Sequence, residues 1–188
     1  MSDAAKPPPS AFWDFTLSIY RRDGVSPALI ALQDRLGLDV NFLLACLYAG
    51  SRGTKLADGD FARLEDAAAP LRKNLIHPLR QVRRWLKDQS TVAKESADPI
   101  RRAVLAQEIE SEGLQQRAME ARLALASGAA DPALAASNLA RYFAWSKASA
   151  GAPDLDDLAL VLARAFEEPA ETARSRLETA MAGARKPH

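Results

Sequence analysis

The densest group of chargeable side chains in this chain lies between positions 72 and 87. Basic residues recur there at helical spacing, and a tryptophan lies among them. Such a row could hold the phosphates of a nucleic acid, stack a base on the aromatic ring, or bind an acidic protein surface. The candidate surface for an anionic partner consists of Arg72, Lys73, Arg80, Arg83, Arg84, Trp85 and Lys87.

Two other interpretations of this basic row stay open. A solvated helix face has the same composition, with arginine stems covering apolar surface. The row could also pair internally with Glu108, Glu110 and Glu112, which are concentrated on a later helix. Helical spacing places residues 73, 80, 84 and 87 opposite an apolar stripe, which we expect to be buried. The stripe consists of Leu71, Leu75, Leu79, Val82 and Leu86.

Two carboxylates, Glu108 and Glu112, lie four residues apart and therefore near each other on one helix face. Helical bundles that bind two metal ions combine inward glutamates with Glu-x-x-His motifs. His77 and His188 are the only histidines, and neither belongs to such a motif, so we expect no metal site. Glu112 and Gln116 also fall on the apolar seam Leu105–Ile109–Met119–Leu123. There we expect them to fix the helix register or to pair with a buried arginine.

Other candidate chemistry is sparse. Asp154-Leu155-Asp156-Asp157 resembles the acidic motif of some terpene cyclases, but carboxylates at this place are typical of a helix start. Residues 50–55 lack the spacing of a phosphate-binding loop. A nucleophilic triad would need His77 or His188, and Cys46 lies in an apolar run where a thiol is inert. We therefore expect no catalytic residue, no cofactor and a non-enzymatic protein.

The elements that would position these residues are helices, because strand-type alternation is absent and proline or glycine marks successive helix ends. Three polar-proline pairs, Ser26-Pro27, Asp98-Pro99 and Asp131-Pro132, predict helix starts. Pro70 and Pro78 predict breaks or kinks inside a long periodic stretch. The expected helices are Ser10–Arg22, Ser26–Leu36, Asp39–Ala49, Asp60–Asp88, Asp98–Ala126, Asp131–Ser149, Asp154–Phe166 and Pro169–Met181.

The third expected helix is apolar on every side, which predicts that it is enclosed by the others. Its glycine-containing turn at 36–39 also fits a helix-turn-helix, but a DNA-reading helix needs basic or amide side chains, and only Asn41 is offered. The fold class is all-α, a single-domain helical bundle with an N-terminal orthogonal three-helix unit around a buried helix. The predicted core includes Phe12, Trp13, Phe15, Val40, Leu43, Leu44 and Leu47.

The predicted organisation is a disordered tail at 1–9, one helical domain at 10–182 and a disordered tail at 183–188. Within the domain, the N-terminal helical unit covers 10–50 and the long-helix bundle covers 58–182.

Several short motifs resemble a family of small bacterial conserved proteins described only as a domain of unknown function. They lie mainly in the first half of the chain, and the resemblance implies an all-helical cytoplasmic protein without an established activity. The motifs are Phe12-Trp13-Asp14-Phe15, Leu17-Ser18-Ile19-Tyr20, Val25, Ala31-Leu32-Gln33-Asp34, Gly37-Leu38-Asp39-Val40-Asn41, Pro78-Leu79-Arg80 and Val82-Arg83-Arg84-Trp85-Leu86-Lys87.

Bulk composition narrows the function classes. A net charge of +1 over 188 residues gives no overall field that would recruit nucleic acid or an anionic membrane. The longest apolar run is too short for a membrane span, and the N-terminus lacks a signal pattern, so we expect a cytoplasmic protein. The leading hypothesis is protein–protein contact, as a homodimer or with another protein. The alternatives are a nucleic-acid-associated regulator that uses Arg80, Arg83, Arg84, Lys87 and Trp85, and a binder of an apolar ligand.

Overall fold

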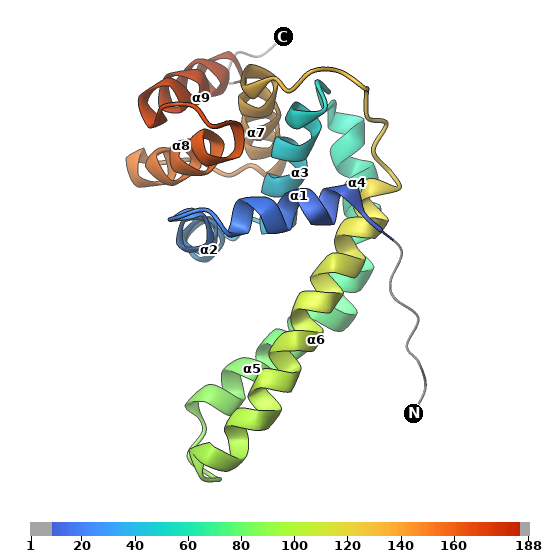
Figure 1. Cartoon of the computed structure of the whole chain (residues 1–188), viewed down its shortest axis with the longest axis vertical. Coiled ribbons are helices and arrows are strands. Elements are labelled where there is room, and N and C mark those ends of the chain that lie inside the picture. Colours follow the sequence, from blue (N-terminus) through green and yellow to red (C-terminus); the bar gives the residue numbers. More distant parts are fainter. Residues whose placement is uncertain (1–8, 185–188) are drawn as a thin grey trace.

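In the computed structural model, which describes residues 9–184, every regular element is a helix (Figure 1). This confirms the all-α fold class. Their order is α1 (Ala11–Tyr20), α2 (Val25–Leu36), α3 (Val40–Ser51), α4 (Asp58–Leu71), the π-helix η1 (Arg72–Ile76), α5 (His77–Asp88), α6 (Lys94–Glu120), α7 (Pro132–Ser146), α8 (Ala152–Phe166) and α9 (Ala170–Ala184).

Helix α3 is the centre of the fold, and every residue from 41 to 50 is buried. Asp39 caps its first turn by accepting a hydrogen bond from the Asn41 amide. Helix α7 packs closely along α3 at Gly50, where an added Cβ would lie only 2.5 Å from the Ala135 Cβ. The prediction of an enclosed third helix is therefore confirmed, and a groove-reading role for this helix is incompatible with its burial.

The predicted core list is right for four residues and too generous for three. Phe12, Leu43, Leu44 and Leu47 are buried. Trp13, Phe15 and Val40 are only partly buried, because they lie where the core meets the surface. The Phe15 ring, for example, tilts against the Tyr48 ring at a centroid distance of 5.4 Å.

Helices α7, α8 and α9 pack together beside α3, and α2 packs on α8 (Figure 1). The acidic start of α8 belongs to this packing. Asp154 accepts a hydrogen bond from the Gly151 amide, and both Asp154 and Asp157 form salt bridges with Arg35 of α2. These contacts support the interpretation of residues 154–157 as a helix start. We call α1–α4 and α7–α9, together with residues 115–120 of α6, the body.

A helical hairpin projects from the body (Figure 1). Helix α4 continues through η1 into α5, the chain turns at residues 89–93, and α6 runs back to the body. Breaks or kinks were expected at Pro70 and Pro78, and the helical rod is broken at neither, but an irregular turn lies between them. Both prolines stay within the helical rod and flank the π-helical turn, a form that accommodates an irregular backbone bonding pattern. We call residues 72–114 the hairpin.

Several predicted boundaries need correction. Asp131 caps α7 as expected. However, α2 begins after Gly24, whose φ of 81° is left-handed, so Ser26 lies inside the helix. Asp98 and Pro99 lie inside α6, which begins at Lys94 because Ala97 already packs in the hairpin. Helix α9 continues to Ala184, beyond the predicted helix end at Met181, so residues 183 and 184 of the predicted disordered tail are helical. Residues 1–8 and 185–188 of the predicted tails lie outside the described residues.

Candidate functional site

The interior of the hairpin is held together by charged side chains. Arg80 of α5 donates from Nε to Glu108 Oε1 of α6 over 2.8 Å and from Nη2 to Glu112 Oε1 over 2.9 Å. Arg83 donates from Nε to Glu108 Oε2 over 2.6 Å. Internal pairing, one of the three interpretations of the basic row, is confirmed for these two arginines, which point toward α6 rather than into solvent.

The two glutamates of this cluster respond to it in opposite ways. Burial alone would raise the pKa of Glu108, but hydrogen bonds and charges from Arg83 and Arg80 outweigh it and lower the pKa. Burial raises the pKa of Glu112, because its pairing with Arg80 does not fully offset desolvation and the neighbouring Glu108 charge. Glu108, 3% exposed, is therefore the charged anchor of the hairpin.

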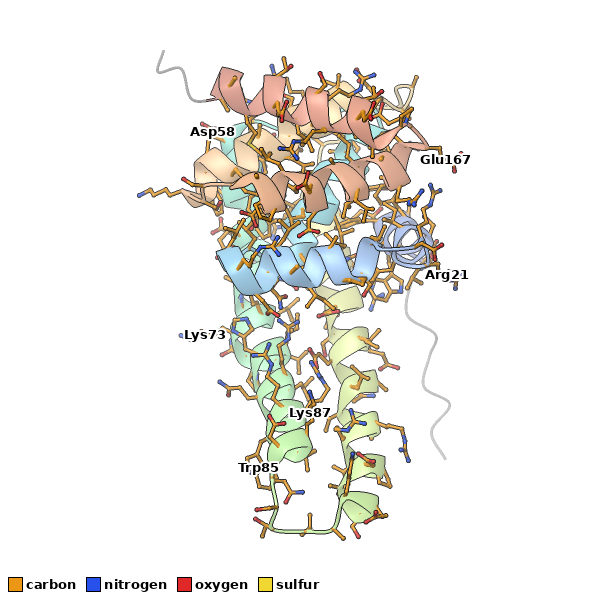
Figure 2. All side chains as sticks on the ribbon, turned by 90° about the vertical axis from the view of Figure 1, so that its left-hand side faces the viewer. Arg21, Asp58, Lys73, Trp85, Lys87 and Glu167 are labelled. Carbon is orange, nitrogen blue, oxygen red and sulfur yellow. The ribbon has the colours of Figure 1, made fainter. Side chains whose placement is uncertain are left out.

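The candidate basic surface is thereby divided. Arg72 lies at the base of the hairpin, where it pairs with Asp39 over 2.8 Å and also with Glu65. Lys73, Arg84 and Lys87 are exposed and form no salt bridge with any residue between 9 and 184. Trp85 is 60% exposed near the tip (Figure 2). Four of the seven residues thus remain available to a partner.

Apolar side chains lie on the outside of the hairpin. Val82 was expected in a buried stripe, and Leu105 and Ile109 in a buried seam, yet all three are exposed because the inward positions are occupied by the arginine–glutamate cluster. Among the described residues, seven of the nine exposed large hydrophobic side chains fall between positions 82 and 114. They are Val82, Trp85, Val92, Ile100, Leu105, Ile109 and Leu114.

A buried chain of amide and hydroxyl groups joins α6 to the body, and we call it the joint. Thr16 of α1 donates to Gln116, Gln116 donates to Asn41 of α3, and Asn41 donates to Gln115, over 2.7–2.8 Å. Gln115 also donates to Asp39. Buried polar groups that satisfy one another fix a single packing arrangement. The joint therefore fixes the direction in which the hairpin leaves the body.

Only part of the joint could be predicted from the sequence. Gln116 was expected to set the register of its helix, but its partners on α1 and α3 are 100 and 75 positions away. No local spacing links residues that far apart. Glu112 was expected to pair with an arginine, and it forms a salt bridge with Arg80.

The remaining candidates do not gather into a reaction site. His77 is exposed on α5, whereas Cys46 is buried in α3, where burial raises the pKa of its thiol. An open groove of about 750 Å³ lies between α7 and α9, and Trp145 lines it with Arg141 and Arg176. Both arginines are paired, with Asp58 and Glu168 respectively. Residues 9–184 contain no cluster of three or more histidine, cysteine or acidic side chains placed to hold a metal ion.

Between residues 9 and 184 no helix has both the length and the apolar character needed to span a bilayer.

Residues 11–119 match the model of a family described as a protein of unknown function (DUF2390). The matched segment runs from α1 almost to the end of α6, so it includes the complete hairpin and the joint. Neither a curated protein nor a solved structure matches the chain. The comparisons therefore identify the structural unit to which the hairpin belongs and assign no activity to it.

Proposed function

The chain belongs to this family of proteins of unknown function, since the match covers more than half of its length, and we propose that it acts by protein–protein contact through the hairpin. One observation carries the proposal. Seven of nine exposed large hydrophobic side chains in the described part of the chain lie on a segment of 33 residues that projects from the body. Clustered exposed apolar side chains mark interaction sites in soluble proteins.

The construction of the hairpin supports this use. Charged groups usually lie outside and apolar groups inside, but here Glu108 is buried between two arginines while Val82 and Ile100 face solvent. A partner that covered the apolar side chains would gain the burial energy that the free hairpin lacks, about 25 cal/mol per Å² of apolar surface. The ion pairs hold α5 and α6 in place beforehand, which lowers the entropy cost of binding.

A contact role also accounts for the perturbed carboxylates without catalysis. Shifted pKa values often mark reaction sites. Here the shifted groups Glu108 and Glu112 are bonded to Arg80 and Arg83 of the facing helix, so their charges serve to join two elements. We therefore propose a non-enzymatic protein.

Photo-crosslinking in the native host tests the proposal. A benzophenone amino acid replaces Trp85 in one variant and, in the control, Ile30, an exposed apolar residue of α2 in the body. We expect adducts of defined mass from position 85 and none from position 30. Adducts from position 30 alone would assign contact to the body and overturn the hairpin proposal.

Nucleic-acid binding is the second candidate, because Lys73, Arg84 and Lys87 remain unpaired within the described part and Trp85, next to Arg84 in the sequence, is exposed. Basic and aromatic side chains together bind single strands by charge and stacking. If the protein binds nucleic acid, it should raise the anisotropy of a labelled oligonucleotide. This rise should weaken with added salt and disappear in the double variant Arg84→Glu/Lys87→Glu. No binding at about 50 mM salt would eliminate it.

A further inference from the structure

The two sides of the hairpin differ in chemistry. Arg80 and Arg83 define the side of α5 that faces α6, and Glu108 and Glu112 define the side of α6 that faces α5. Because a helix turns by about 100° per residue, Leu79, Val82 and Leu86 lie to one side of the inward row. On α6, Ile100, Gln107 and Leu114 lie to one side of the inward row at intervals of seven residues.

These two rows lie on the same side of the hairpin. When two antiparallel helices face each other, the residue immediately before an inward-facing residue lies on the same side of the pair in both helices. None of the six residues carries a charge. Val82, Ile100 and Leu114 are 45%, 57% and 43% exposed and Gln107 is also exposed, whereas Leu79 is partly buried and Leu86 is buried. We call this the apolar side, and it comprises Leu79, Val82, Leu86, Ile100, Gln107 and Leu114.

The opposite side has a mixed character. Positions that follow the inward rows include His77 and Arg84 of α5 and Asp98 and Leu105 of α6. The exposed Lys87 lies close to this side, from which Figure 2 views the hairpin. Charges of both signs interrupt the apolar residues there. The two sides thus provide a docking candidate and an internal control on the same pair of helices.

We infer that the apolar side binds a second copy of this chain, so that two hairpins pack into a four-helix bundle. The inference rests on the proposed contact role of the hairpin and names its partner. A two-fold interface places the same surface on both subunits, so it must be complementary to itself. A row of uncharged and mainly apolar side chains meets this condition, because it opposes no like charges when paired with its own copy. A nucleic acid or a charged peptide would find no opposite charge on this side.

The dimensions of the apolar side fit a small, weak dimer contact. Residues 100–114 of α6 extend for roughly 22 Å at 1.5 Å per residue, and two helices side by side are roughly 20 Å wide. The resulting footprint of roughly 450 Å² is about half of the roughly 800 Å² that each partner buries in a stable protein complex, which corresponds to a weak dimer. Rows spaced at about seven residues also match the packing of helical bundles, in which side chains of one pair enter gaps in the other.

Sedimentation velocity from about 2 to 200 µM tests the inference, a range that brackets ordinary dimer affinities. We expect the wild type to approach twice the chain mass of 20.4 kDa. The double variant Val82→Glu/Ile100→Glu should remain monomeric, with a dissociation constant raised at least about 100-fold. The control Leu105→Glu/Ile109→Glu, on other faces of α6, should dimerise like the wild type. Circular dichroism confirms that both variants, altered only at exposed sites, retain their helices.

Three results have distinct consequences. A wild type that stays monomeric at 200 µM overturns the second-copy inference, and so does dimerisation that fails only in the Leu105/Ile109 control. If monomeric protein still forms adducts of another mass from position 85 in the host, the contact role of the hairpin stands with a different partner. A monomer that forms no adduct from position 85 overturns both proposals.

Discussion

The body and the hairpin differ in the side chains that join their helices. The body surrounds α3 with apolar side chains and keeps charges at its surface, as Leu47 at 0% exposure illustrates. The hairpin places charges between its two helices and leaves apolar side chains outside. Its few buried apolar residues, Ile76, Leu86 and Ala97, are separate from the main core cluster. Only the body therefore has the internal apolar surface that stabilises a free-standing unit.

This difference indicates what each region is for. An apolar interior gives global stability and needs no partner. A hairpin with a charged interior has a fixed geometry but retains unburied apolar area, which a partner can cover. The body therefore serves as the support, with the joint as its attachment, and the hairpin serves as the contact element.

The largest effect should come from the core of the body. Leu47→Ala should lower the free energy of unfolding by about 3–4 kcal/mol, because it leaves a cavity in a fully buried helix. Urea unfolding followed by circular dichroism measures the loss. The control Ile30→Ala, at an exposed position, should change stability by less than about 0.5 kcal/mol. Equal effects at the two positions would contradict the contrast between body core and surface.

The next largest effect should come from the charged interior of the hairpin. Glu108→Gln should cost about 2–3 kcal/mol, because it leaves Arg83 without its carboxylate partner at a partly buried site. Hydrogen exchange should accelerate in α5 and remain unchanged in α3. The matched control is Glu110→Gln, an exposed glutamate on the same helix. If α3 loses protection before α5, the two regions are not separable.

Acid should affect the two glutamates with opposite sign. The lowered pKa of Glu108 contributes stability above the usual pKa of about 4.3, and this contribution is lost as the pH falls through the lower folded value. The raised pKa of Glu112 means that the folded chain takes up that proton more readily, so stability is gained as the pH falls through its folded value.

Urea unfolding between about pH 6 and 3 separates these contributions. Relative to the wild type, Glu108→Gln should lose less stability on acidification and Glu112→Gln should lose more. The reverse order would show that the charges inside the hairpin are arranged differently.

The smallest effect on folding should come from the exterior of the hairpin. Val82→Ser and Ile100→Ser should each change the unfolding free energy of the monomer by no more than about 0.5 kcal/mol, since both side chains are largely exposed. Measurement at about 1 µM keeps the protein below ordinary dimer affinities. A loss above about 1.5 kcal/mol would mean that these side chains stabilise the monomer and would remove the need for a partner.

Much of the fold could be predicted from local signals. Asp39 and Asp131 predict the starts of their helices correctly, because an N-cap side chain bonds only to the turn that follows it, which is a local interaction. The enclosure of α3 follows from an apolar surface with no polar face. Ser26 and Asp98 were wrongly predicted as helix starts, because the same residue types occur inside helices when the preceding residues can already adopt helical geometry.

The hairpin was harder to predict, for a physical reason. Helix α5 carries both a leucine-rich row and an arginine-rich row, and periodicity alone does not say which row faces the neighbour. Burial of Arg80 and Arg83 depends on Glu108, which is 28 and 25 positions away. The glutamates were noted as possible partners, but their contact required the turn at 89–93 to bring the two helices together.

Hydrogen–deuterium exchange read by mass spectrometry at about 1 and 200 µM protein tests the central claim most directly, because it shows which region a partner covers. The account predicts that amides of α5 and the first half of α6 gain protection at the higher concentration, while those of α7, α8 and α9 do not. Concentration-dependent protection confined to α7–α9, or none anywhere, would contradict the assignment of the hairpin as the surface at which two copies of this chain meet.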